Sequence, residues 1–184
     1  MSTERRLTPD DLDDGFPSGI MEIQSRPLAA AVAICVAMML LGSLLGAMVG
    51  REVEVGWYEA LTKPDFEAPW QAFLLVSVLY YPLFALVLYR GLTRIPQDAP
   101  RRQVVGLAVA ALLLNTIWNP VVIGLRDPFV GVVGTAVLLT LVLVLVLTLV
   151  RRDRVSAFLL VPYLLWVVYD LVWSWELWRL NPGA

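Results

Sequence analysis

The sequence predicts an all-α integral membrane protein, folded as a bundle of five transmembrane helices. Apolar residues fill 59% of the 184 positions, compared with roughly 45 to 50% in ordinary soluble domains. Five segments each hold about 20 mostly apolar residues, which is the helix length that crosses the hydrocarbon core of a bilayer. Short connections join these segments, so we expect one membrane domain over residues 27–181, with the lipid bilayer as its solvent.

The apolar segments set the limits of the five predicted helices. We expect them over residues 27–49, 70–89, 103–125, 128–150 and 155–178. The first four contain no charged residue, whereas the fifth contains Asp170 and Glu176. Gly42, Gly46 and Gly50 form a ridge of small residues on the first helix, which suits close contact with another helix of the bundle or of a second copy. A homodimer is therefore one expected assembly.

The segment before the first helix, residues 1–26, is expected to be a flexible cytoplasmic tail. Four aspartates between positions 10 and 14 make it acidic, whereas a signal peptide begins with a basic region. The tail is therefore not interpreted as a targeting signal.

The distribution of Lys and Arg predicts the orientation in the membrane, because basic residues accumulate in short cytoplasmic loops. Ten lie in the tail or in the connections that join helices two to three and four to five, and four lie on the other side. We expect a multi-pass protein of a cell membrane, with a cytoplasmic N-terminus and the C-terminus outside.

The composition excludes several kinds of chemistry. The chain has no His, and Cys35 is its only Cys, so it has no internal disulfide, no usual His or multi-Cys metal site and no Ser-His or Cys-His nucleophile pair. We expect no catalytic residue, no metal site and no obligate cofactor, and hence not an enzyme. The formal charge of −2 gives no reason to expect a nucleic acid partner.

Aromatic side chains gather in the outer half of this predicted bundle. Trp57 and Tyr58 fall in the long outer loop, and Trp118 and Trp173 in the outer halves of helices three and five. The alternative is a belt of aromatic residues at the lipid headgroups, which is the preferred interpretation for Trp175 and Trp178.

Two polar residues lie near the middle of predicted helices, where an unpaired polar group is costly. They belong to two stripes at helical spacing: Trp166, Asp170 and Trp173 on helix five, and Asn115, Trp118 and Asn119 on helix three. Two interpretations stay open. Asp170 and Asn115 either share a hydrogen bond that only fixes packing, or they face a ligand.

Several motifs resemble those of the TspO/MBR family of tryptophan-rich sensory proteins and translocator proteins, which includes the peripheral benzodiazepine receptor. They are Trp57-Tyr58-x-x-Leu61-x-Lys63-Pro64, Leu114-Asn115-x-x-Trp118, Gly124-Leu125-Arg126-x-Pro128, Pro162-Tyr163-Leu164-Leu165-Trp166-Val167 and Trp178-Arg179-Leu180-Asn181. The resemblance runs from about Trp57 to Asn181, and the order and spacing of the motifs make it specific.

The resemblance implies a five-helix bundle, often dimeric, whose first loop closes a pocket for porphyrins, haem and other lipophilic ligands. We therefore expect a membrane receptor, regulator or carrier, with porphyrin or haem as the candidate ligand. The expected ligand-binding residues are Trp57, Tyr58, Asn115, Trp118, Asn119, Tyr163, Trp166, Asp170 and Trp173.

The chain also departs from the family pattern. Gln71 and Ser77 stand where the family has tryptophans, and Asp170 stands in place of a small residue. Asp170 suggests one alternative function, a small proton-coupled transporter in which this carboxylate binds a proton or the substrate. A porphyrin-degrading enzyme with tryptophan electron donors is the other alternative.

Overall fold

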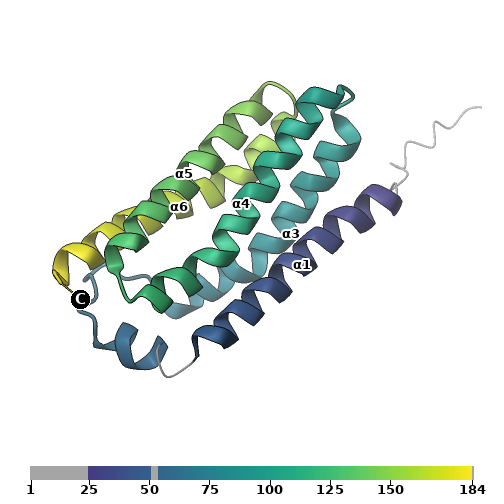
Figure 1. The fold of residues 1–184 in the computed structure, drawn as a ribbon. Helices are drawn as coiled ribbons and strands as arrows, with labels where there is room; N and C mark the ends of the chain where they lie inside the picture. The colour runs from purple at the N-terminus through teal and green to yellow at the C-terminus, as the bar shows by residue number, and fades with distance from the viewer. Residues whose placement is uncertain (1–24, 51–53, 184) are drawn as a thin grey trace, which may run out of the picture.

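The computed structural model describes residues 25–50 and 54–183 and is all-helical over these ranges (Figure 1). Its long helices are α1 (Ser25–Val49), α3 (Trp70–Arg94), α4 (Asp98–Leu125), α5 (Pro128–Val150) and α6 (Arg154–Leu180), and a short helical turn, η2 (Glu54–Tyr58), precedes α3. Each of these five helices is long and apolar enough to cross a membrane. The predicted fold class is therefore confirmed. The predicted tail lies outside the described residues, except for Ser25 and Arg26, which begin α1.

Two helices extend five residues beyond the apolar segments that predicted them, and α1 and α6 extend by one or two residues at an end. The predictions stop at residue 89 and resume at 103, whereas α3 continues to Arg94 and α4 starts at Asp98. Asp98 forms an ion pair with Arg101 in the first turn of α4, and Arg90 forms one with Asp153. The added turns of α3 and α4 contain charged residues that form ion pairs. Hydropathy alone therefore does not reveal these turns.

The local sequence explains the sharp turn between α4 and α5. Arg126 adopts the left-handed conformation, with φ of 53°, and its backbone N–H donates to the carbonyl of Ile123, which ends α4. The Asp127 carboxylate accepts a 2.8 Å hydrogen bond from the Phe129 N–H, and Pro128 occupies the first position of α5. An Asp cap followed by Pro is a common way to begin a helix.

The five helices form a ring in the order α1, α3, α6, α5 and α4, and α4 packs back on α1. Helix α3 also contacts α4 across the ring. Residues 54–69, the α4–α5 turn and the C-terminal end of α6 lie together at one end of the bundle, which we call the loop end (Figure 1). The opposite end carries the α3–α4 and α5–α6 connections, and we call it the arginine end.

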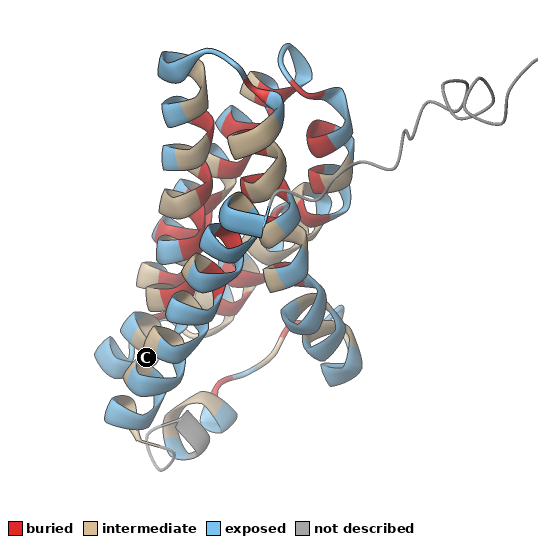
Figure 2. Cartoon of the chain, turned by 90° about the vertical axis from the view of Figure 1, so that its right-hand side faces the viewer, coloured by how far each residue is buried: buried red, intermediate tan, exposed pale blue. Residues whose placement is uncertain are grey.

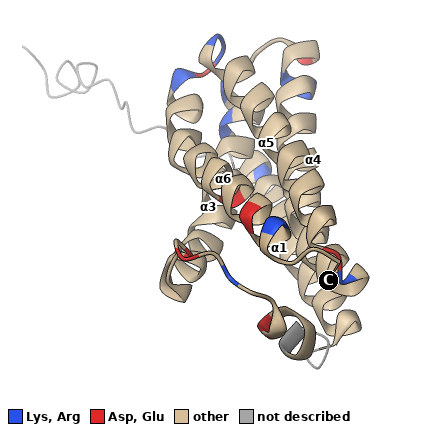
Figure 3. Cartoon of the chain, turned by 90° about the vertical axis from the view of Figure 1, so that its left-hand side faces the viewer, with Lys and Arg blue, Asp and Glu red and all other residues tan. Residues whose placement is uncertain are grey.

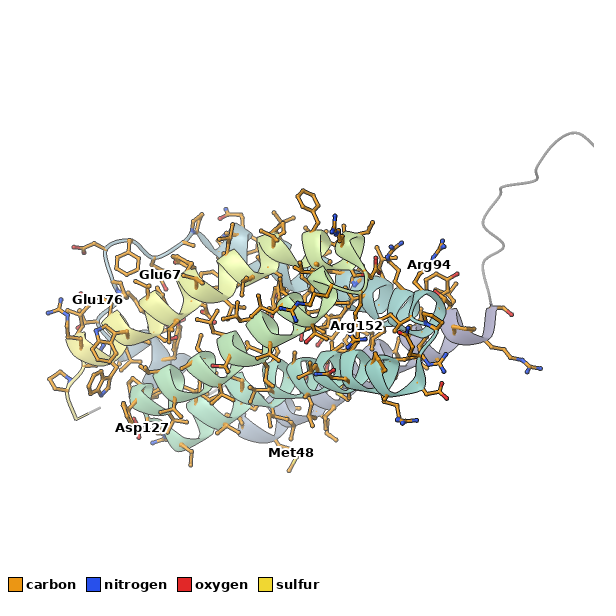
Figure 4. The ribbon with its side chains drawn as sticks, turned by 90° about the horizontal axis from the view of Figure 1, so that it is seen from above. Met48, Glu67, Arg94, Asp127, Arg152 and Glu176 are labelled. Atoms are coloured by element: carbon orange, nitrogen blue, oxygen red, sulfur yellow. The ribbon has the colours of Figure 1, made fainter. Side chains whose placement is uncertain are left out.

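Charged side chains distinguish the two ends. Figure 3 shows most of the Lys and Arg residues toward the arginine end. Among the side chains labelled in Figure 4, Arg94 and Arg152 lie there, whereas Glu67, Asp127 and Glu176 lie at the loop end. This is the asymmetry on which the predicted orientation rests, and the orientation itself stays a prediction.

The buried core lies mainly in the arginine-end half (Figure 2). Its largest fully buried side chains include Phe84, Leu88, Leu112, Leu145, Leu149 and Leu160. The Phe84 ring packs against Tyr80 and Tyr163 at centroid distances of 4.7 and 5.5 Å. Aliphatic and aromatic side chains thus fill this half of the ring.

A polar network joins α3 to the start of α6 at the arginine end. Arg90 donates to both carboxylate oxygens of Asp153, at 2.9 Å from Nε and 2.7 Å from Nη2. The buried Ser156 hydroxyl donates to the same carboxylate at 2.6 Å. Burial of Asp153 disfavours its charge, but hydrogen bonds from Arg90 and Ser156 outweigh burial and hold its pKa below the ordinary value.

Candidate functional site: a cavity under the loop

A cavity of about 1030 Å³ occupies the loop-end half of the ring. All five long helices, η2 and residues 67–69 of the following loop contribute to its walls. Its volume lies near the upper limit of the usual range for small-molecule sites, roughly 300 to 1,000 Å³. The predicted ligand-binding residues all line this cavity: Trp57, Tyr58, Asn115, Trp118, Asn119, Tyr163, Trp166, Asp170 and Trp173.

Hydrogen bonds from α6 tether the loop that leads from η2 to α3. The Asn181 side chain accepts from the Thr62 N–H at 2.8 Å and donates to the Thr62 carbonyl at 2.9 Å. The Tyr169 hydroxyl accepts from the Ala68 N–H at 2.7 Å and donates to the Phe66 carbonyl at 3.3 Å. The loop is therefore fastened at two points along the helix that carries most of the site residues.

Lys63 fastens the loop to η2. Its ammonium donates to the backbone carbonyl of Tyr58 and lies 3.5 Å from the centroid of the Tyr58 ring, within the range of a cation–π contact. Partial burial lowers the pKa of Lys63, and the carboxylates of Glu67 and Glu59 oppose that shift. Lys63 therefore stabilises the loop against η2, and it does not line the cavity.

Aromatic rings from several elements form one wall of the cavity. Phe73 of α3 packs edge-on against Trp166 and Trp173 of α6, at centroid distances of 5.2 and 6.3 Å. Tyr58 of η2 lies 6.4 Å from Trp173. Leu61 and Leu177 pack into the same cluster beneath the loop. The wall is therefore assembled from three parts of the chain.

Trp118 of α4 occupies its position because α5 has no side chain at residue 134. A Cβ atom built on Gly134 would lie 1.8 Å from Cζ3 of the Trp118 indole. The indole therefore lies directly on the α5 backbone, and one of its sides remains available to line the cavity. Glycine permits this close approach because it has no side chain.

One interpretation of the sequence pairs Asp170 with Asn115, whereas the structure pairs Asn115 with Tyr163. The Tyr163 hydroxyl donates to Oδ1 of the Asn115 side chain at 3.2 Å. The hydrogen bond between Asp170 and Asn115 is not formed, so that interpretation is wrong: the Asn115 side chain pairs with Tyr163 instead. Within the described part of the chain, Asp170 has no hydrogen bond or ion pair, although it lines the cavity.

Two further polar groups of the lining are buried without a partner. They are the Thr116 hydroxyl and the indole N–H of Trp173, whose residues are 6% and 8% exposed. Buried polar groups are hydrogen-bonded in most proteins, so each such exception needs an explanation.

The remaining aromatic and polar residues divide between the cavity and the outer surface. Asn119 lines the cavity but is exposed. Trp175, which is 51% exposed, packs on Trp178 at 5.0 Å. Neither Trp175 nor Trp178 lines the cavity, as the headgroup interpretation predicts.

Several residues that the structure places at the site were not among the predicted ligand-binding residues. Phe73 and Thr116 line the cavity, and Tyr169 and Asn181 hold the loop. Two signals in the sequence point to the residues that hold the loop. Tyr169 lies at helical spacing from Trp166, and Asn181 lies just after the end of a helix. In the described ranges, no group of three or more His, Cys, Asp or Glu residues is placed to hold a metal ion.

Together, the fold and cavity define a multi-pass membrane protein with an internal compartment large enough for a small molecule. The TspO/MBR family profile matches residues 31–179, and the chain belongs to that family. The resemblance found in the sequence motifs is thereby confirmed.

Several known proteins are similar over much of the chain. Protein CrtK of Rhodobacter capsulatus is 30% identical over 131 residues, which cover 69% of this chain and 79% of that protein. The tryptophan-rich sensory protein of Cereibacter sphaeroides is 28% identical over 125 residues, covering 68% and 77%. The tryptophan-rich protein TspO of Archaeoglobus fulgidus is 26% identical over 150 residues, covering 82% and 95%.

Proposed function

We propose that this protein is a membrane receptor, regulator or carrier that binds porphyrin, haem or another planar lipophilic molecule in the cavity. The observation that carries the proposal is a cavity of about 1030 Å³ walled by tryptophans and closed by a tethered loop. Aromatic faces stack on flat ring systems, and an apolar cavity with a few polar groups suits such ligands. The name of the Cereibacter sphaeroides relative, tryptophan-rich sensory protein, supports a sensory role.

Haem, if it is the ligand, would be held without His ligation, because the chain contains no His. Cys35 is buried in α1 and does not line the cavity, so it is not an axial ligand either. Stacking on Trp118 and Trp166 would then carry the binding, and the ring would be a ligand and not a fixed cofactor.

The test is a fluorescence-quenching titration of the detergent-purified protein with protoporphyrin IX and with its uncharged dimethyl ester. We expect saturable quenching by at least one of them, and weaker binding in Trp118→Phe. Trp175→Phe is the matched control, because Trp175 is 51% exposed and lies outside the cavity lining. Quenching that never saturates, or that is the same in both variants, would contradict the proposal.

A second candidate function is transport, and the unpaired carboxylate of Asp170 in the cavity favours it. A transporter predicts that Asp170→Asn abolishes ligand flux into proteoliposomes while binding persists. Unchanged flux would remove this candidate. We propose no catalytic role, so illumination of the protoporphyrin complex should yield no product that the porphyrin alone does not form, and a protein-dependent product would establish the enzymatic alternative.

A homodimer also remains a prediction. The small-residue ridge of α1 is used at least partly inside the bundle, where Gly42 packs against Thr116 of α4 and lines the cavity together with Gly46. A Cβ on Gly46 or Gly50 would meet no atom within 4 Å, so the remainder of the ridge is open to a second copy. Light scattering of the purified protein, coupled to size exclusion, measures whether the particle contains one chain or two.

A further inference from the structure

The charges around the cavity point to the kind of planar ligand that it accepts. We infer that the cavity selects lipophilic organic cations, with the Asp170 carboxylate as their counter-ion, over planar anions such as porphyrin dicarboxylates. This inference rests on the proposed function, because it requires that planar lipophiles enter the cavity at all.

The first observation is the isolation of Asp170. Its carboxylate lines the cavity within a membrane-spanning helix, and no described residue forms a hydrogen bond or an ion pair with it. Its neighbours on the same face of α6 are Trp166 and Trp173, which have no positive charge. A carboxylate in such surroundings is unfavourable unless it takes up a proton or a cation accompanies it, and at mildly alkaline pH the cation is the better partner.

The second observation is the sign of the remaining charge. The charged residues among the described lining are Asp170 and Glu67, and both are acidic. The described basic residues of the loop end do not line the cavity. Lys63 contacts Tyr58, and Arg179 pairs with Glu176. Arg126 is exposed at the α4–α5 turn. An anionic ligand would therefore meet like charge at the cavity wall without a compensating Lys or Arg from these residues.

The third observation is the aromatic surroundings of the carboxylate. Trp166 and Trp173 flank Asp170 at helical spacing, and Phe73 lies against both rings at 5.2 and 6.3 Å. Faces of aromatic rings attract cations, and tryptophan does so most strongly. A delocalised cation would gain ring stacking and charge pairing in the same position.

The test compares three tricyclic probes of similar shape at mildly alkaline pH: 9-aminoacridine as the cation, acridine as the neutral molecule and acridine-9-carboxylate as the anion. Binding is measured by fluorescence on the wild-type protein and on Asp170→Asn. We expect the wild type to prefer the cation over the anion by at least about tenfold, and Asp170→Asn to lose about tenfold for the cation alone. The neutral probe should bind both proteins equally.

Glu176→Gln is the matched control, because Glu176 lies six positions further along α6, pairs with Arg179 and does not line the cavity. It should leave the affinity for all three probes unchanged. Equal affinity of wild type for cation, neutral molecule and anion would overturn the inference and leave the proposed function standing. Failure of all three probes to bind would instead count against the proposed function. The wild-type comparison decides the matter even where a variant folds poorly.

Discussion

In the arginine-end half of the bundle, the helices fill the space between them with side chains such as Phe84 and Leu112, whereas in the loop-end half the same helices surround a cavity of about 1030 Å³. The lining explains the difference. Glycines at positions 42, 46 and 131 leave space on α1 and α5, and large aromatic residues on α3, α4 and α6 form the walls. One ring of helices thus holds a packed support and a hollow compartment.

The two halves also treat polar groups differently. At the arginine end, Asp153 is paired with Arg90 and Ser156 and is fully satisfied. At the loop end, Asp170 and the Trp173 indole N–H lack protein partners. Unpartnered polar groups thus lie beside the cavity, whereas the Arg90–Asp153 pair holds the helices together at the packed end.

Removal of a large side chain from the packed half should have the largest effect on stability. Phe84→Ala leaves a void beside Tyr80 and Tyr163, since Phe84 is fully buried, and should lower the free energy of unfolding by about 3 kcal/mol. Phe158→Ala is the control, because Phe158 is 78% exposed, and should change it by less than about 0.5 kcal/mol. Thermal unfolding in detergent measures both, and equal effects would show that the arginine-end half is not the packed support.

Removal of the charge of Asp153 should have the next largest effect. Asp153→Asn leaves Arg90 unpaired, and because the Arg90 side chain keeps 18% exposure, we expect a loss of about 2 to 3 kcal/mol, below the 3 to 5 of a fully buried pair. Asp98→Asn is the control: Asp98 pairs with Arg101, but its side chain is 70% exposed, so the loss should be at most about 0.5 kcal/mol.

The same pair predicts a pH dependence. The folded-state pKa of Asp153 is lower than its ordinary value, so the stabilisation is fully present above that ordinary value, about 4, and is lost as the pH falls through the lower folded-state pKa. Unfolding temperatures measured down through this window should converge for wild type and Asp153→Asn. A gap between them that stays constant in acid would contradict the assigned role of the carboxylate.

A change behind the cavity wall should affect binding more than stability. Gly134→Ala forces the Trp118 indole away from α5, because the new Cβ would lie 1.8 Å from it, and we expect the displaced ring to reduce the space in the cavity that it lines. We expect about tenfold weaker binding of the porphyrin ester. Gly46→Ala is the control, since Gly46 also lines the cavity but its Cβ would meet no atom within 4 Å. Equal loss of affinity in both variants would show that the position of Trp118 is not what matters.

Loosening the loop should have the smallest effect of the series. Asn181→Ala removes both hydrogen bonds to Thr62, each worth about 1 kcal/mol or less at an exposed site, so the ligand should dissociate roughly fivefold faster. Stopped-flow displacement of the bound ligand measures this rate. Tyr169→Phe, which releases the loop at Ala68 and Phe66, should act in the same direction. An unchanged rate in both variants would mean that the loop does not close the cavity.

Much of this architecture was predictable from the sequence, because apolar segments and helical spacing are local properties. They placed five helices and put Trp166, Asp170 and Trp173 on one face, and the structure brings these residues to the cavity. Features that depend on which helices meet were not predictable. The partner of Asn115 is Tyr163 and not Asp170, because contacts across the ring decide it. The continuation of α3 through Arg90 likewise depends on Asp153, which lies 63 residues further along the chain.

Thiol labelling shows whether the ligand enters the loop-end half or the arginine-end half. Cys35 is the only Cys of the chain, so Cys35→Ser provides a background for Ser174→Cys, which faces the cavity, and Ala157→Cys, which lies on the same helix in the packed core. With a small methanethiosulfonate reagent, Ser174→Cys should react, and saturating porphyrin ester should slow its reaction in proportion to occupancy, while Ala157→Cys stays unreactive throughout. Ligand that quenches tryptophan fluorescence but leaves the labelling of Ser174→Cys unchanged would contradict the account.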